Sequence, residues 1–384
     1  GPLAAAIARA VPGRALVPRP AAFCRFRGEG GALLDEGIAL LFPGPRSYTG
    51  EDVLELQGHG GPVVLREIAR RCVGLGARLA EPGEFTRRAF LNDRLDLAQA
   101  EAVADLIDAA SAEAARGAVR SLAGEFSARI AAVVAALTRL RLHVEACIDF
   151  PEEEIDPADR EAQRTMLAAA RDDLARLLEG AAQGAVLREG LTVVLVGRPN
   201  VGKSSLLNRL AGEDVAIVTA VAGTTRDPVR ATIAVEGVPI HLIDTAGLRE
   251  SGDEVERIGI ARTWEAIGRA GAAILIEEAS GGAGEEESRI LARIPQGLPL
   301  ARVTNKIDLA GLPAGRETSG AEVRLRLSAK TGEGVAALRS WLLEVAGWHP
   351  AGEGVFLARE RHLVALREAA GHLANAAGGN MQAL

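Results

Sequence analysis

Cysteine and long apolar runs are scarce in this sequence, and each scarcity excludes a class of protein. Only three cysteines occur among 384 residues, Cys24, Cys72 and Cys147, and none belongs to a CxxC pair. This pattern excludes a disulfide framework and a cysteine zinc site and is typical of a reducing compartment, so we expect a cytoplasmic protein. No uncharged apolar run approaches the roughly 18 residues of a membrane span, and no signal peptide opens the chain, so we expect no membrane partner.

Positive charge and aromatic residues are also in short supply. The chain carries 44 lysine and arginine residues against 51 acidic residues, a formal net charge of −7. A general nucleic-acid binder normally has a basic surplus, so any RNA contact must come from a local patch or through a partner. Hydrophobic residues make up 48% and aromatic residues 3% of the chain, which predicts an aliphatic core of a helical or α/β kind.

The first part of the chain, residues 1–92, has the pattern of an α+β domain. Ile38–Phe42 and Val53–Leu56 are short apolar runs typical of strands, and Gly/Pro clusters separate them. Val63–Leu75 has helical spacing and is followed by Gly76.

Residues 93–189 are predicted to be helical, with one helix near Arg160–Leu178, and helical spacing returns over residues 348–384. Strands and helices alternate between these parts, over residues 190–347, which favours a mostly parallel sheet. We therefore predict a multidomain α/β protein in which a Ras-like P-loop domain is inserted into a helical domain.

A phosphate-binding loop follows the apolar strand Leu191–Val196. Gly197–Ser204 matches GxxxxGKS/T and precedes the helical Ser205–Leu210, which is the context that this motif requires. Backbone amides of the loop face the phosphates, Lys203 supplies a charge to the β- and γ-phosphates, and the Ser204 hydroxyl ligates magnesium.

The base is predicted from two later segments. Asn305-Lys306-Ile307-Asp308 follows a predicted strand, and the Asp308 carboxylate can accept two hydrogen bonds from guanine that adenine does not offer. Asn305 can bond the purine edge, and the Lys306 stem can lie over the base. In Ser328-Ala329-Lys330 a backbone amide can meet the guanine carbonyl oxygen.

Two further segments are predicted to respond to the terminal phosphate. Asp244-Thr245-Ala246-Gly247 follows a strand, with Asp244 holding magnesium through water and the Gly247 amide facing the γ-phosphate. Of Thr224 and Thr225, we expect Thr225 to reach magnesium. The residues assigned to nucleotide contacts are Asn200, Val201, Gly202, Lys203, Ser204, Ser205, Thr219, Thr224, Thr225, Asp244, Thr245, Ala246, Gly247, Asn305, Lys306, Asp308, Ser328, Ala329 and Lys330.

Leu248 stands where Ras-like enzymes place a water-orienting glutamine, so another group must act in hydrolysis. Asn200, with the neighbouring segment Ala220–Arg226, can hold a monovalent cation in place of an arginine finger. Glu256 can orient the water, and on the residues alone Glu254 is nearly as good. The catalytic candidates are Lys203, Thr225, Gly247 and Glu256.

Several motifs outside the nucleotide segments resemble the bacterial MnmE (TrmE) family of tRNA-modification GTPases. They are Glu81–Asn92, Leu95–Ala102, Ser47–Asp52, His59–Pro62 and Asp253–Gly259. The resemblance covers nearly the whole chain. It implies that residues 1–92 form a folate-binding domain that makes a homodimer, and that the inserted nucleotide domains pair in the GTP state, activated by potassium.

The resemblance also implies roles for matched residues and partners. Glu256 becomes the water-positioning acid, and the potassium ligands become Asn200, Thr219, Val221 and Thr224. The dimer is expected to act with the flavoprotein MnmG (GidA) on the wobble uridine of certain tRNAs, making 5-carboxymethylaminomethyl or aminomethyl groups. The one-carbon unit comes from 5-formyl- or 5,10-methylene-tetrahydrofolate.

For the folate we expect Arg87, Arg88 and Arg94 to pair with its carboxylates and Glu84 with its pterin ring. The sequence departs from the family pattern in lacking an opening strand and a Phe-Cys-Ile-Gly-Lys tail, so we expect the last helical part to be truncated. Two alternatives remain: a GTP-dependent ribosome-assembly switch, and a folate carrier whose loading the GTPase reports.

Overall fold

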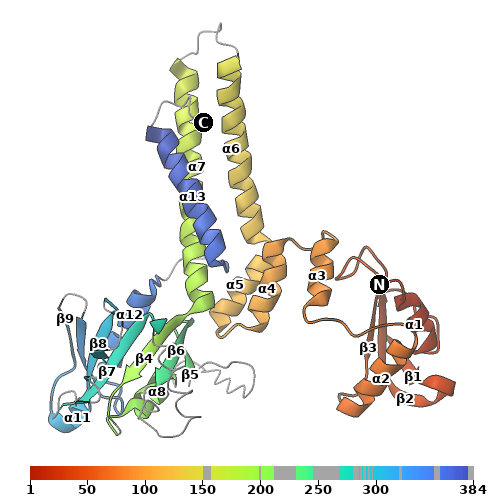
Figure 1. Ribbon diagram of the computed structural model, residues 1–384, viewed down its shortest axis with the longest axis horizontal. Coiled ribbons are helices and arrows are strands. Elements are labelled where there is room, and N and C mark those ends of the chain that lie inside the picture. Colours follow the sequence, from red (N-terminus) through yellow and green to blue (C-terminus); the bar gives the residue numbers. More distant parts are fainter. Residues whose placement is uncertain are drawn as a thin grey trace. The chain divides into compact units, whose positions relative to one another are not determined.

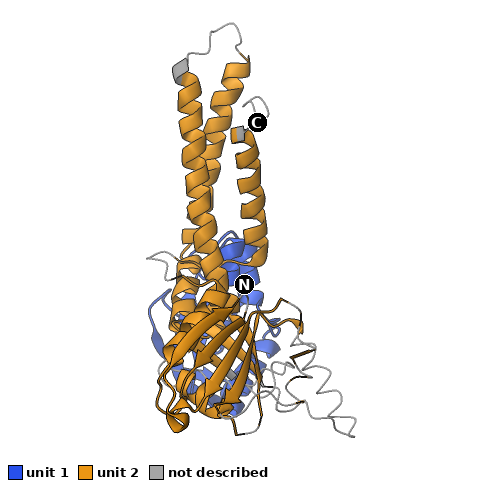
Figure 2. Ribbon diagram, turned by 90° about the vertical axis from the view of Figure 1, so that its left-hand side faces the viewer, with its two compact units in different colours: residues 1–104 blue, residues 105–384 orange. Residues whose placement is uncertain are grey.

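The protein is described here from a computed structural model, which falls into two compact units, residues 1–104 and residues 105–384 (Figure 2). The described residues are 1–149, 157–198, 200–211, 231–244, 268–279, 285, 288, 291–292, 295, 297–319, 322–349 and 355–378. Among the helices that can be described, none is long and apolar enough to cross a membrane.

Unit 1 is built on a three-stranded antiparallel sheet in the order β1-β2-β3 (Figure 1). Its elements are α1 (Ala4–Ala10), β1 (Ala22–Arg27), the 3-10 turn η1 (Glu29–Gly31), β2 (Leu33–Phe42), β3 (Val53–Gln57), α2 (Pro62–Gly74), α3 (Glu84–Leu91) and the first part of α4 (Leu97–Ile107). Alternate residues of β1 and β2 face the helices, so Cys24, Phe26 and Ala39 are buried with Ile7 and Ile68. The two predicted strands and the helix after them are confirmed, whereas α1 and β1 were not anticipated.

The helices of unit 2 are dominated by three long ones that run side by side (Figure 1). They are α6 (Glu125–Asp149), α7 (Pro157–Glu189) and α13 (Glu360–Gly378), with the shorter α5 (Ala112–Leu122) beside α6 and α7. α7 packs against both α6 and α13, so the helical parts before and after the sheet domain join in one body. This arrangement confirms the predicted insertion.

Helix α7 is longer than the predicted Arg160–Leu178, because two glycines in its last part obscured the helical pattern. Packing explains why residue 184 is a glycine. A side chain there would meet the Phe356 carbonyl oxygen, since the segment that returns from the sheet domain crosses α7 at this point.

The second sheet has seven strands in the order β5-β6-β4-β7-β8-β10-β9. Its elements are β4 (Leu191–Val196), α8 (Lys203–Ala211), β5 (Ala231–Val235), β6 (Val238–Asp244), β7 (Ala272–Glu278), β8 (Leu300–Asn305), α11 (Ile307–Ala310), β9 (Gly315–Ser319), β10 (Glu322–Arg326) and α12 (Val335–Ala346). Only the edge strands β5 and β9 run antiparallel to their neighbours, which confirms the mostly parallel sheet. The interior strand β4 is almost wholly buried, as a sheet covered on both faces requires.

Candidate functional site

The carboxyl ends of five parallel strands meet at one edge of the seven-stranded sheet, where open α/β sheets bind their ligands. Strand register brings these ends level. Leu195 of β4 lies beside Asp244 of β6, and Glu278 of β7 lies beside Asn305 of β8. The P-loop, the segment from Asp244, the NKxD residues and the 328–330 loop therefore start at one edge of the sheet, although they are far apart in sequence.

The P-loop leads from β4 directly into α8, which begins at Lys203. The Lys203 ammonium donates to the carbonyl oxygens of Gly197 and Arg198, so it lies at the loop itself. Val201 is buried, whereas Ser204 and Ser205 are exposed in the first turn of α8. Exposed hydroxyl groups beside free amides at a helix start are suited to phosphates and to a hard cation.

Asn305 is almost fully buried, with an exposed fraction of 1%. Its amide nitrogen donates to the Val201 carbonyl oxygen at 2.8 Å, and its amide oxygen accepts from the Ala329 backbone at 3.0 Å. One side chain thus ties the P-loop to the 328–330 loop. The sequence suggested a contact with the purine edge, and this linking role was missed.

Gly202 has two physical reasons to be glycine. Its φ is +99°, in the left-handed region, and a side chain there would lie 2.3 Å from the Asn305 amide nitrogen. The P-loop glycine and the asparagine of the later motif therefore depend on one another.

Lys306 connects the P-loop to a strand that the sequence did not assign to the site. Its ammonium donates to the Asn200 carbonyl oxygen at 2.7 Å and pairs with Glu278 at the end of β7. Both Lys306 and Asn200 have positive φ, +63° and +67°, and asparagine tolerates that conformation better than most residues. The Asn200 side chain is exposed.

Asp308 is exposed, but a hydrogen bond from the buried Ser328 orients its carboxylate. The Ser328 hydroxyl donates to Asp308 Oδ1 at 2.7 Å and accepts from the Thr331 amide at 3.1 Å. Arg209 of α8 donates to the carbonyl oxygens of Ala329 and Lys330, which fixes the same loop from the other side. Glu278 and Arg209 had no motif that could have identified them.

Part of the predicted site lies outside the described residues. This applies to Thr219, Val221, Thr224, Thr225, Thr245, Ala246, Gly247, Glu254 and Glu256. Of Asp244 only the backbone position is described. Within the described residues no group of three or more histidine, cysteine or acidic side chains gathers as for a metal ion. Ser204 in the first turn of α8 carries a hydroxyl group, and Asp244 at the end of β6 is a carboxylate residue. Both are oxygen donors of the kind that Mg²⁺ prefers.

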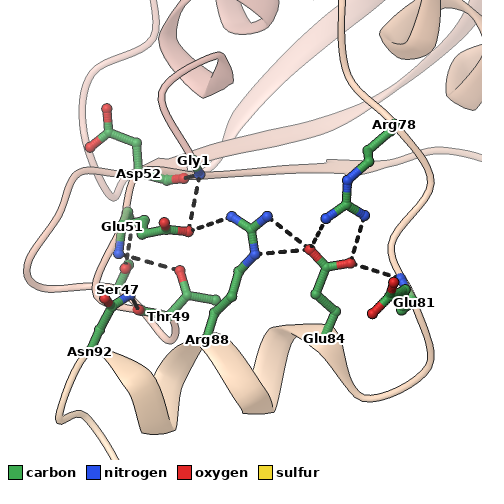
Figure 3. A network of polar contacts seen from close by, with 10 residues as sticks. All are labelled: Gly1, Ser47, Thr49, Glu51, Asp52, Arg78, Glu81, Glu84, Arg88 and Asn92. Atoms are coloured by element: carbon green, nitrogen blue, oxygen red, sulfur yellow. Dashed lines mark hydrogen bonds and ion pairs between the residues drawn. The ribbon is translucent and has the colours of Figure 1, made fainter.

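A second polar cluster lies in unit 1 around Glu84 at the start of α3 (Figure 3). Glu84 is 3% exposed and accepts a two-pronged pair of hydrogen bonds from Arg78, at 2.7 and 2.8 Å. Arg88 also donates to Glu84 and reaches Glu51 at 2.9 Å. The Arg78 bonds, followed by the Glu81 backbone amide, lower the Glu84 pKa to about 2.

A cavity of about 430 Å³ adjoins this cluster. Arg78, Glu84 and Arg88 line it together with Glu51 and Thr49. Of the predicted folate residues, Glu84 and Arg88 are therefore at the cavity. Arg87 and Arg94 are not among its lining residues: Arg87 pairs with exposed Glu81, and Arg94 is itself exposed. Arg78 was missed by sequence reasoning because it lies in no recognised motif.

One edge of the parallel sheet carries the P-loop before α8, the NKxD residues and the Ser328 loop. This combination defines the class of P-loop GTPases. A sequence profile for the MnmE helical domain matches residues 97–383, and one for the N-terminus of the GTP-binding protein TrmE matches residues 1–94. The chain belongs to the MnmE family.

Individual relatives agree with this assignment. The tRNA modification GTPase MnmE of Thiobacillus denitrificans is 61% identical over 376 residues, which is 98% of this chain and 82% of the relative. That of Azoarcus sp. is 60% identical over 366 residues, 95% of this chain and 81% of the relative. Among solved structures, the G domain of the T. maritima FeoB iron transporter is 26% identical and covers 41% of this chain and 98% of its own, with a TM-score of 0.30.

Proposed function

We propose that this chain couples GTP hydrolysis to modification of the tRNA wobble uridine, acting as a homodimer with the flavoprotein MnmG. The GTP-binding role is supported above all by the two hydrogen bonds of the Asn305 side chain. They hold the P-loop and the 328–330 loop in one arrangement beside Asp308. The tRNA part is supported by relatives that are about 60% identical and are named tRNA modification GTPases.

In this proposal, different residues bind the phosphates and the base of GTP. Lys203 and the amides at the start of α8 bind the phosphates, and Asp308, oriented by Ser328, accepts hydrogen bonds from guanine. Lys306 is held by Glu278 and the P-loop, which supports the proposal that its stem lies over the base. When bound at Ser204 and Asp244, Mg²⁺ would supply positive charge next to the phosphates.

The hydrolytic step needs groups beyond Lys203. We propose Glu256 as the water-positioning acid, Thr225 and Gly247 as groups that sense the terminal phosphate, and Asn200, Thr219, Val221 and Thr224 as potassium ligands. Potassium would offset developing negative charge where Ras-like enzymes use arginine. The exposed Asn200 side chain on a tight loop is suited to a cation that pairing of two G domains would enclose.

The cation proposal is tested by GTP hydrolysis in potassium or sodium salts over a range of protein concentrations. We expect potassium to accelerate turnover, with the rate per chain rising with concentration because two nucleotide domains must meet. The variant Asn200→Gly removes the amide without straining the positive φ and should lose the potassium effect. Asn208→Ala, an exposed asparagine of α8, serves as the control. Equal rates in both salts would exclude this role of Asn200.

For unit 1 we propose a tetrahydrofolate derivative in the cavity beside Glu84 and Arg88, where a carboxylate and guanidinium groups line an otherwise largely apolar space. Calorimetry with 5-formyl-tetrahydrofolate should give one site per chain. Absence of heat together with tight ribosomal RNA binding would favour the ribosome-assembly alternative. The domain limits 1–92, 93–189, 190–347 and 348–384 remain part of this proposal.

A further inference from the structure

The first 46 residues carry positive charge in a chain that is negative as a whole. They contain six arginines and no lysine, against three acidic residues, Glu29, Asp35 and Glu36. Two of these acids are already engaged, Asp35 by His59 and Glu36 by Arg25. A local basic surface therefore exists in unit 1 despite the net charge of −7.

The fold brings Arg14, Arg19 and Arg27 to one border of the small sheet. The Arg27 amide donates to the Val11 carbonyl oxygen, and the Arg19 amide donates to the Leu41 carbonyl oxygen, both at 2.8 Å. Because Val11 is level with the end of β1 and Arg19 with its beginning, the segment between them runs back along the outer edge of β1. Arg14 lies within this segment and close to Cys24, where its charge opposes the rise in the thiol pKa that burial causes.

We name this surface the arginine edge. It consists of Arg14, Arg19, Arg27 and Arg46, all exposed. Across the described part of the chain none of the four forms an ion pair with a carboxylate, although Arg19 and Arg27 donate to the carbonyl oxygens of Arg46 and Gly31. Most other arginines of unit 1 do have such partners, as Arg25, Arg70, Arg78, Arg87 and Arg88 show.

The backbone of Arg19 adds a second, independent observation. Its φ is +77°, a left-handed conformation that is unfavourable for arginine, and it presents an exposed guanidinium bonded to Arg46. Backbone strain of this kind clusters at functional sites, where the surrounding structure holds it in place. Phe23, 65% exposed on β1, provides an aromatic face between the two ends of the arginine edge.

We infer that the arginine edge contacts the phosphate backbone of the RNA substrate, with Phe23 available to stack on an unpaired base. Exposed guanidinium groups that lack carboxylate partners favour phosphates, and an interleaved aromatic side chain favours single-stranded RNA over an acidic protein. This inference rests on the proposed tRNA function and assigns the local patch that the overall negative charge requires.

The test compares two variants with the same change in charge. The first, Arg14→Gln/Arg19→Asn/Arg27→Gln, removes three groups of the arginine edge, and asparagine tolerates the positive φ at position 19. The second, Arg70→Gln/Arg141→Gln/Arg176→Gln, removes three exposed arginines that pair with carboxylates. The affinity for an unmodified tRNA transcript is measured by fluorescence anisotropy between about 50 and 200 mM salt.

We expect the first variant to bind at least about tenfold more weakly at low salt, with the slope of log K against log salt reduced by about two, because each lost phosphate contact contributes about 0.7–0.9. The control should match the wild type, and GTP hydrolysis and urea unfolding should be alike in all three proteins. Wild-type affinity in the first variant, or an equal loss in the control, would overturn the inference. Loss of flavoprotein binding with RNA binding intact would also overturn it. A wild-type chain that does not bind tRNA would contradict the proposed function itself.

Discussion

The nucleotide site and the polar cluster around Glu84 rely on different basic side chains. All three lysines of the sequence, Lys203, Lys306 and Lys330, lie in the nucleotide segments, whereas residues 1–104 contain arginine and no lysine. At the nucleotide site, lysine acts as a compact charge that donates to carbonyl oxygens of the P-loop. In unit 1, the forked guanidinium of Arg78 grips a buried carboxylate with two parallel bonds.

The two regions also differ in which side chains stay exposed to a ligand. At the edge of the large sheet, buried Asn305 and Ser328 arrange their neighbours and leave Asp308 and Ser204 exposed. Around Glu84, the charged groups pair with one another, and the binding space is the cavity that they line rather than an exposed edge. Substitutions in the two regions test this difference between the nucleotide site and the Glu84 cluster.

The largest effect is expected from Asp308→Asn. The variant loses the acceptor pair for guanine, so GTP affinity should fall by about a thousandfold while xanthosine triphosphate binding improves. Competition against a fluorescent guanine nucleotide measures both. Unchanged GTP affinity would show that Asp308 does not recognise the base.

Lys203→Ala should reduce GTP turnover by about a hundredfold or more and weaken binding, since its charge at the phosphates is lost. Lys203→Arg is the matched comparison, because it keeps the charge and changes the shape. If arginine restored full turnover, the distinction between compact and forked cations drawn above would be wrong.

Glu84→Gln should change the acid sensitivity of unit 1. The folded pKa of Glu84 is about 2, below its ordinary value of 4.5, so its stabilising contribution is fully present above about pH 4.5 and is lost as the pH falls towards 2. Urea unfolding across this range should show a steeper acid loss in the wild type than in the variant. Parallel curves would mean that Arg78 does not stabilise the ionised carboxylate.

The smallest effect is expected from Arg87→Gln. Arg87 and Glu81 are 59% and 63% exposed, and exposed pairs contribute about 0–1 kcal/mol. The free energy of unfolding should therefore change by less than about 1 kcal/mol. A larger loss would place Arg87 in the cluster around Glu84 rather than at its margin.

The sequence predicted the features that depend on local pattern. The P-loop could be recognised because strand, loop and helix are contiguous, and the parallel sheet followed from alternating elements. The bond from Asn305 to Val201 joins residues 104 positions apart, so no local pattern contains it. Arg78 and Arg209 likewise act through tertiary contacts. Helix α1 and strand β1 were missed because glycine and proline residues surround them and obscure their short patterns.

Acylation of lysines with and without nucleotide tests the central claim most directly, because mass spectrometry can follow all three lysines in one experiment. The account predicts that GDP slows the reaction of Lys203 and Lys306 sharply, that ADP at the same concentration has no such effect, and that Asp308→Asn abolishes the protection by GDP. Equal reaction rates with and without GDP in the wild-type chain would contradict it.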